Sequence, residues 1–260
     1  MPQPVAVFLR QSQMLKTAIA DCLDKPKPNP VHRLRSTTRR LEATLELLAA
    51  SAGIPRLQQK SRPLIKSLRR IRRAAGKVRD RDVHRELLGV YKTSHDAARL
   101  DKDLAAVRKK SALRLQKRLL KEQSEIQRGY DDLESLLQPV LDLNVSGGAL
   151  ADVARSRFAA AARDLDPRHD DELHSIRKAC KTARYLAEIG SDTSKVAATL
   201  SARLERLQQT TGAWHDHLLL LNEAQASLPE DSPLIRQIRA EAERLRRLAE
   251  SMAKRMLATT

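Results

Sequence analysis

The sequence predicts an all-α protein made of two pseudo-symmetric helical bundles, of about four to five helices each, related by an internal duplication. Leucine and alanine recur at helical spacing through most of the 260 residues, glycine occurs only 8 times, and no segment shows strand-like alternation. Aromatic residues make up 2% of the chain, so the core must be mainly aliphatic, as in helix bundles. Two motifs recur in the same order in both halves, which predicts the duplication.

Proline and glycine mark the expected helix ends in the first half. The segment "DKPKPNP" ends the first helix, because proline cannot continue a helix and restricts the residue before it. Gly53 and Pro55 in "SAGIP" end the second helix, and Gly76 is expected to interrupt the third. We therefore expect helices over residues 5–23, 30–50, 57–75, from about 79 onward, and 101–138.

The segment "PVLDLNVSGG" (139–148) is the best candidate boundary, since it combines Pro, Asn, Ser and paired Gly between two helical blocks. We expect a first helical bundle over residues 1–145 and a second over 146–260. Within the second half the expected helices cover residues 149–165, 172–190, 195–211, 213–227 and 233–257.

The duplication is visible in two motif pairs. The first pair is "VHRLRSTTRRLEATLELL" and "LHSIRKACKTARYLAEIG", which align His32 with His174 at a constant offset. The second pair is "LRRIRRAAGKVRDRDV" and "LERLQQTTGAWHDHLL", which align Gly76 with Gly212. The repeat is far longer than a solenoid period, so it predicts two bundles and not an array.

The first motif places basic residues on one helix face and apolar residues on the opposite face. At about 100° per residue, Arg35 and Arg39 fall close to His32, while the leucines lie behind them. The helix after Arg56 carries a further basic stripe, and no acidic residue occurs from Arg56 to Arg79. Like charges on one stripe repel by a few tenths of a kcal/mol per pair, a cost that a bound anion would offset. The candidate anion-binding residues are His32, Arg35, Arg39, Arg40, Lys66, Arg69, Arg70, Arg73, Lys77, His174, Arg177, Lys178, Lys181 and Arg184.

The net charge of +17, from 49 Lys and Arg against 32 Asp and Glu, favours a polyanionic partner. Two structural alternatives stay open for these residues. A run of like charge is often a solvated helix face, and His32 and His174 could be partly buried histidines that bond internally.

The four motifs "VHRLRSTTRRLEATLELL", "GKVRDRDV", "LHSIRKACKTARYLAEIG" and "GAWHDHLLLL", in this order, resemble the CHAD family, an α-helical domain named for its histidines. The resemblance covers nearly the whole chain. It implies two helical bundles related by a pseudo-twofold axis, with basic helices that face a shared groove or pore. It also implies binding of inorganic polyphosphate and association with polyphosphate granules in the cytoplasm. Its candidate contacts are His32, Arg35, Arg39, Arg40, His174, Arg177, Lys181 and Arg184, with Arg69, Arg70, Arg73 and Lys77 as further positions.

The second half departs from this pattern. Lys181 is followed by Thr182 where the family usually has a basic pair, and Glu205 stands in the helix that matches the basic stripe of the first half. We therefore expect the first half to bind the anion more tightly.

Other functions predict other features. Single-stranded nucleic acid normally stacks on aromatic side chains, which are scarce here, although a duplex binder could do without them. A metal-dependent phosphohydrolase could use His215, Asp216 and His217, but histidines two residues apart point to different helix faces. Helices that bind a membrane surface usually carry Trp or Phe beside their basic face, and the basic helices here lack such a flank. We expect a cytoplasmic protein without catalysis, cofactor or metal; the oligomeric state is left open.

The two cysteines, Cys22 and Cys180, lie far apart and match no metal or disulfide pattern, so we expect free thiols.

Overall fold

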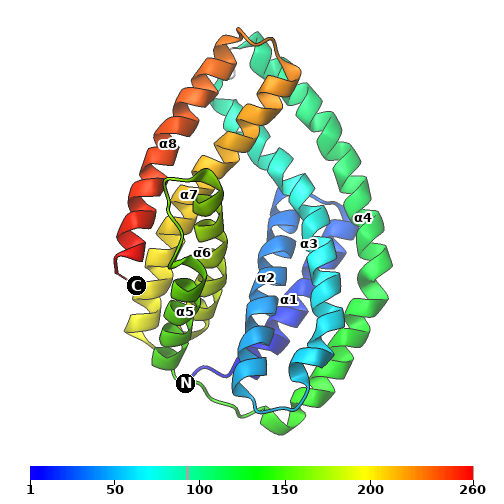
Figure 1. Ribbon diagram of the computed structural model, residues 1–260. Coiled ribbons are helices and arrows are strands. Elements are labelled where there is room, and N and C mark those ends of the chain that lie inside the picture. The colour runs from blue at the N-terminus through cyan, green and yellow to red at the C-terminus, as the bar shows by residue number, and fades with distance from the viewer. Residues whose placement is uncertain (92–93, 260) are drawn as a thin grey trace. The chain divides into compact units, whose positions relative to one another are not determined.

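The protein is all-α in the computed structural model, which describes residues 1–91 and 94–259 (Figure 1). No strand occurs among these residues, which confirms the predicted fold class. The helices are α1 (Pro4–Asp24), α2 (Pro28–Ser51), α3 (Leu57–Leu88), α4 (His95–Leu137), α5 (Gly147–Ala162), α6 (Asp170–Gly190), α7 (Lys195–Ser227) and α8 (Pro233–Leu257). Two short 3₁₀ turns, Gly89–Tyr91 and Gln138–Val140, follow α3 and α4.

Two predicted interruptions are absent, because α3 runs through Gly76 and α7 runs through Gly212 without a break. An interior glycine costs a helix only about 1 kcal/mol, and packing along the rest of a long helix outweighs this cost. A Cβ at Gly76 would lie 3.1 Å from Nη1 of Arg35, so a side chain there would require the Arg35 guanidinium group to shift slightly.

The chain forms two compact units that are not contiguous in sequence. Unit 1 contains Met1–Arg79 and Arg108–Gly147, and unit 2 contains Asp80–Val107 and Gly148–Thr260. The chain passes from unit 1 into unit 2 after Gly147, close to the expected boundary near residue 145, and residues 80–107 of the expected first bundle (1–145) group with unit 2. These residues group with unit 2 because the end of α3 and the start of α4 pack against α7 and α8. The apolar cluster there contains Leu88, Ala97, Leu100, Leu104, Leu220, Leu221, Ala224, Leu228, Leu234, Ile235 and Ile238.

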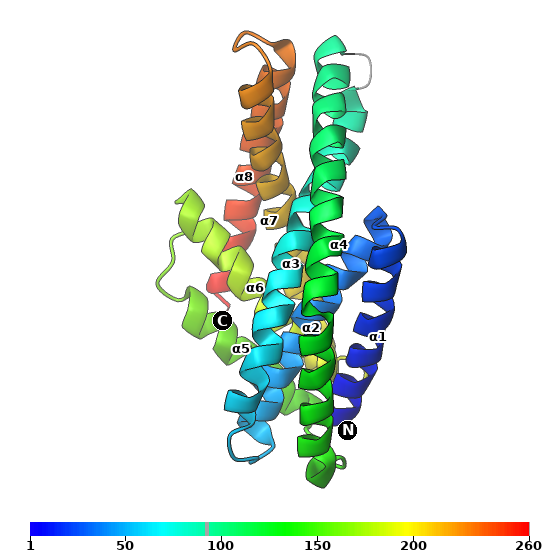
Figure 2. The same cartoon turned by 90° about the vertical axis from the view of Figure 1, so that its right-hand side faces the viewer.

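Unit 1 is held together by an aliphatic core shared by α1, α2, α3 and α4. Figures 1 and 2 show α3 and α4 running antiparallel alongside each other through this unit. Completely buried residues of the core include Leu15, Leu34, Leu41, Leu64, Leu68, Leu115, Leu119 and Leu133. Burying each such side chain stabilises the fold by about 1.5–3 kcal/mol. This burial turns the polar sides of α2, α3 and α4 outward.

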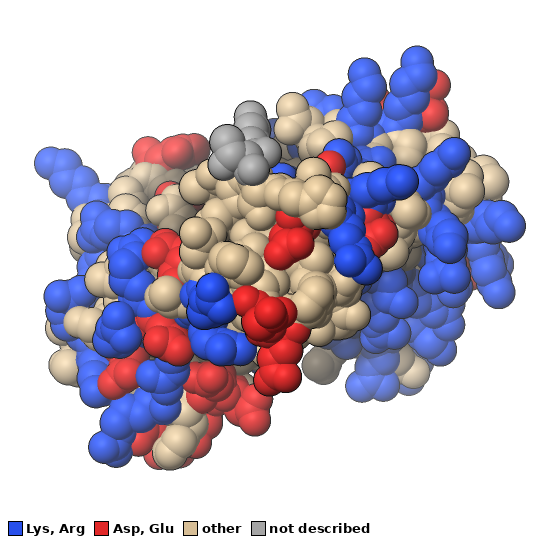
Figure 3. Space-filling model, turned by 90° about the horizontal axis from the view of Figure 1, so that it is seen from above, with Lys and Arg blue, Asp and Glu red and all other residues tan. Residues whose placement is uncertain are grey.

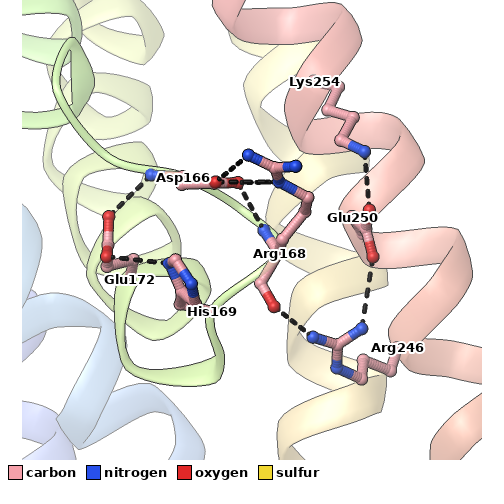
Figure 4. Close-up of polar contacts among 7 residues, drawn as sticks. All are labelled: Asp166, Arg168, His169, Glu172, Arg246, Glu250 and Lys254. Carbon is pink, nitrogen blue, oxygen red and sulfur yellow. Dashed lines mark hydrogen bonds and ion pairs between the residues drawn. The ribbon is translucent and has the colours of Figure 1, made fainter.

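Unit 2 fixes the start of α6 through the loop before it (Figure 4). The backbone N–H of Asp166 donates to Oε2 of Glu172 at 2.6 Å, and Arg168 pairs with Asp166. Arg246 of α8 donates to the carbonyl oxygen of Arg168, and its Nε lies 2.7 Å from Oδ1 of Asp170. Helix α8 therefore holds the first turn of the helix that carries His174.

The predicted free thiols are confirmed, since Cys22 and Cys180 are both buried and unpaired with each other. Burial raises the pKa of each thiol to about 12, which keeps both cysteines protonated and unreactive. Within the described residues, none of the helices combines the length and apolar character that crossing a bilayer requires.

Candidate anion-binding site

The predicted basic face of α2 is present and meets α3 in unit 1. The guanidinium group of Arg35 lies against Gly76 of α3, where the missing side chain leaves room for it. Partial burial lowers the pKa of His32, and the nearby charges of Arg79, Arg35 and Arg40 lower it further. Four cationic or titratable side chains from α2 and α3 are therefore close enough to influence one another.

Helix α3 continues this surface through two arginines that share one carboxylate of α2. Nη2 of Arg69 lies 2.5 Å from Oε1 of Glu42, and Nη1 of Arg72 contacts Oε2 of the same residue. The side chain of Glu42 is 12% exposed, whereas that of Arg69 is 57% exposed. The carboxylate is thus inside and the guanidinium group of Arg69 remains at the surface.

The other side of α3 forms a groove with α4, which we call the cationic groove. Its volume is about 400 Å³. It is lined by Arg70, Arg73, Ala74, Lys77, Ser111, Arg114, Lys117, Arg118 and Lys121. Seven of these nine residues are basic and none is acidic, so the walls attract anions, while Ala74 and Ser111 leave space between the helices.

Glu122 lies beside the groove and contacts one arginine from each wall. Its Oε2 is 3.2 Å from Nη1 of Arg70, and its Oε1 is 3.2 Å from Nη1 of Arg118. The Glu122 side chain is 3% exposed. Burial raises its pKa, but hydrogen bonds from Ser67, Arg70 and Arg118 outweigh that effect and lower the pKa overall, so the carboxylate is ionised at neutral pH.

The α4 wall of the groove lies outside the predicted site, which did not include Arg114, Lys117, Arg118 and Lys121. The sequence does carry a signal for this wall. No acidic residue occurs from Leu104 to Lys121, which is the same pattern as in the basic stripe of α3. At the right of Figure 3, Lys and Arg side chains are crowded together with few carboxylates. At the lower left of the same view, they are mixed with Asp and Glu.

Lys66 and Lys77 are both exposed on α3. Lys77 lines the groove, and Lys66 lies outside it. The predicted residues of unit 1 lie on α2 and α3, and the groove adds basic residues of α4. We refer to this set as the basic surface of unit 1 and define it as His32, Arg35, Arg39, Arg40, Lys66, Arg69, Arg70, Arg72, Arg73, Lys77, Arg79, Arg114, Lys117, Arg118 and Lys121.

In unit 2, α6 and α7 bring the predicted residues into a more neutral setting. The ring centroids of His174 and His215 are 4.6 Å apart. Nη2 of Arg177 lies 3.9 Å from Oδ1 of Asp216, and Lys178 is exposed. Partial burial lowers the pKa of His174, and Lys178, Arg177 and Lys181 lower it further. Basic residues are present here, but a carboxylate is within reach of Arg177.

Arg184 lies in an internal network of unit 2. Its side chain is 11% exposed, its Nε donates to Oε1 of Gln208 at 3.1 Å, and its Nη1 lies 3.4 Å from Oε1 of Glu205. The guanidinium carbon also lies 4.6 Å from the ring centroid of Tyr185. An anion would have to compete with these partners to reach Arg184.

The "HDH" segment is likewise surrounded by protein groups. Nδ1 of His217 lies 2.8 Å from the carbonyl oxygen of Ala213, to which it can only donate. Burial lowers the pKa of His215 to about 3, with Arg177, His174 and Lys181 adding to the effect. Across residues 1–91 and 94–259, the structure contains no group of three or more His, Cys, Asp or Glu side chains arranged to hold a metal ion.

Comparison with known proteins adds two findings. The sequence model of the CHAD domain family matches residues 6–225. The crystal structure of the CHAD domain from the plant Ricinus communis is similar at 20% sequence identity with a TM-score of 0.68, and the alignment covers 98% of this chain and 89% of that chain. This likeness concerns the fold. No curated protein matches the chain.

Proposed function

The chain belongs to the CHAD family, and from this premise we propose that it binds inorganic polyphosphate, without catalysis, through the basic surface of unit 1. The observation that carries the proposal is the cationic groove, where seven basic side chains from α3 and α4 line about 400 Å³. Polyphosphate is a flexible chain with roughly one negative charge per phosphate, so it can follow a row of cations. Guanidinium groups donate paired hydrogen bonds to phosphate oxygens in a fixed plane, and lysines add charge.

Unit 2 contributes less in this proposal. Arg177 lies near Asp216, and Arg184 is engaged by Glu205 and Gln208. Both side chains are also nearly buried, at 13% and 11% exposed, so little of either guanidinium group can reach a phosphate. The proposed biological role is attachment to, or organisation of, polyphosphate granules in the cytoplasm.

Nucleic acid is the competing partner, because it also carries phosphates. The arrangement of the aromatic residues disfavours single strands. Phe8, Phe158, Tyr130, Tyr185 and Trp214 are buried in the core, and Tyr91 is half-buried. Buried rings cannot serve as stacking platforms for bases.

Titration with polyphosphates of increasing length tests the proposal. We expect affinity to increase with length until the chain spans the basic surface of unit 1. The Arg35→Ala/Arg39→Ala variant should bind more weakly than the Arg177→Ala/Lys181→Ala variant, which removes the same charge. Long polyphosphate should displace labelled duplex DNA, while DNA at equal charge should not displace polyphosphate. If DNA is the better competitor, the nucleic-acid function replaces this one.

The histidines predict a pH dependence. The pKa values of His32 and His174 are lowered in the free protein by partial burial and by neighbouring cations. A bound anion favours the imidazolium and raises these values. Affinity should therefore increase as pH falls through the bound-state pKa and level off below the free-state pKa. Because the free values lie below the usual 6.5, the gain continues below that pH.

We expect polyphosphate affinity about two- to tenfold higher at pH 5.5 than at pH 8, measured by titration calorimetry. The His32→Gln/His174→Gln variant should show a flatter profile. His215 adds no proton in this range, since its pKa is about 3. Equal wild-type affinity at both pH values would show that the histidines do not contribute to polyphosphate binding.

A further inference from the structure

Two buried carboxylates lie inside the basic surface of unit 1, which is unexpected for an anion-binding surface. The Glu42 and Glu122 side chains are 12% and 3% exposed, and a negative charge there opposes the binding of phosphate. Each carboxylate nevertheless contacts two arginines. Glu42 contacts Arg69 and Arg72, and Glu122 contacts Arg70 and Arg118.

The contacts with Glu122 leave most of the guanidinium groups of Arg70 and Arg118 available. Arginine has five N–H donors, and Arg70 and Arg118 each approach Glu122 through Nη1. Their side chains remain 43% and 42% exposed, so the other donors can reach a ligand. A free arginine side chain samples many rotamers, and fixing it on binding lowers the affinity. The two carboxylates hold the arginine side chains in place before the ligand binds, which reduces this loss.

The two pairings also join different helices. Arg70 on α3 and Arg118 on α4 form the two walls of the cationic groove, and Glu122 ties both to one point. Arg69 on α3 is tied in the same way to Glu42 on α2. Both carboxylates therefore connect neighbouring helices at the basic surface.

We infer that Glu42 and Glu122 are positioning residues, which hold Arg69, Arg72, Arg70 and Arg118 in the orientation that receives phosphate oxygens. This inference rests on the proposed function. For removal of either carboxylate, this inference and a model based on charge alone predict opposite changes in polyphosphate affinity. Removing a negative charge from a polyanion site should strengthen binding if charge alone matters, and should weaken it if the carboxylate positions the arginines.

The experiment compares Glu122→Gln and Glu42→Gln with Glu134→Gln, titrated with tripolyphosphate in ~0.1 M and ~1 M salt. Glu134 is an exposed acidic residue on α4 of unit 1, and its variant changes the charge by the same amount. At ~1 M salt the screening length is about 3 Å, so distant charge no longer contributes but direct contacts do.

We expect Glu122→Gln and Glu42→Gln to bind about fivefold more weakly than wild type at both salt concentrations. Glu134→Gln should bind slightly more tightly at ~0.1 M salt and equally at ~1 M salt. In Glu122→Gln, ¹⁵N relaxation should show larger motion of Nε–H in Arg70 and Arg118, which a general loss of stability would not produce selectively. Circular dichroism establishes that each variant is folded, and the two glutamates test the inference independently.

Binding by the wild type together with equal or tighter binding by both folded glutamine variants would refute the positioning role and leave the proposed function intact. Absence of tripolyphosphate and long polyphosphate binding by the wild type would remove the proposed function, and this inference with it.

Discussion

Replacement of Arg73, Lys77, Arg114 and Lys117 by alanine in one variant is expected to weaken binding of long polyphosphate about 100-fold at ~0.1 M salt. Each of these residues lines the cationic groove. Exposed ion pairs contribute roughly 0.2–1 kcal/mol each, so four of them give about 1–4 kcal/mol, and a 100-fold loss corresponds to about 2.8 kcal/mol. The slope of log K against log salt should also become less negative, by about 3, because fewer counterions are released.

A matched variant separates this site from net charge. Arg206, Arg239, Arg247 and Arg255 are exposed residues of unit 2, and their replacement removes the same four charges. This control should lose little affinity, about threefold or less, through the weaker long-range field alone. Both variants can be compared by fluorescence anisotropy with labelled polyphosphate. Equal losses in the two would mean that polyphosphate responds only to total charge, and the groove would not be its site.

Replacement of Gly129 by alanine is expected to lower the free energy of unfolding of unit 1 by about 1–2 kcal/mol. A Cβ at Gly129 would lie 2.9 Å from Cβ of Leu64, which is completely buried in α3. Inserting a methyl group into a filled core typically costs 1–3 kcal/mol, and the better helix propensity of alanine returns only part of this. The melting temperature should fall by about 2–4 °C per kcal/mol.

Gly212 provides the opposite result. It also lies inside a helix, but a Cβ there would meet no atom within 4 Å. Gly212→Ala should therefore stabilise unit 2 by about 0.5–1 kcal/mol through helix propensity alone. Thermal unfolding followed by circular dichroism checks both variants. A stable Gly129→Ala protein would show that α3 and α4 are less closely packed than the structure indicates.

Local sequence patterns predicted much of the fold. The prolines at Pro26 and Pro28 mark the α1–α2 turn, and all of "PVLDLNVSGG" except its two glycines lies between α4 and α5. These signals work because proline and glycine act on the backbone within one or two residues. The expected breaks at Gly76 and Gly212 were wrong, because packing along the whole helix outweighs a single glycine. The internal duplication stays a prediction.

The candidate site was predictable only in part. The faces of α2, α3 and α6 follow from helical spacing, which is local information. The pairing of Arg69 with Glu42 and of Arg70 with Glu122 joins residues far apart in sequence, and no helical period shows it. The α4 wall of the groove depends on how α3 and α4 pack together, which the spacing within either helix does not contain.

The division of α3 and α4 between the two units has a consequence for chain synthesis. The ribosome synthesises Leu88, Leu100 and Leu104 well before Leu220 and Ile238, which pack in the same apolar cluster. Because translation proceeds at about 5–20 residues per second, the apolar side chains of these leucines stay exposed to solvent for several seconds before their partners are synthesised. The nascent protein should therefore need a chaperone most during that interval, and a ribosome stalled near residue 150 should carry an aggregation-prone chain.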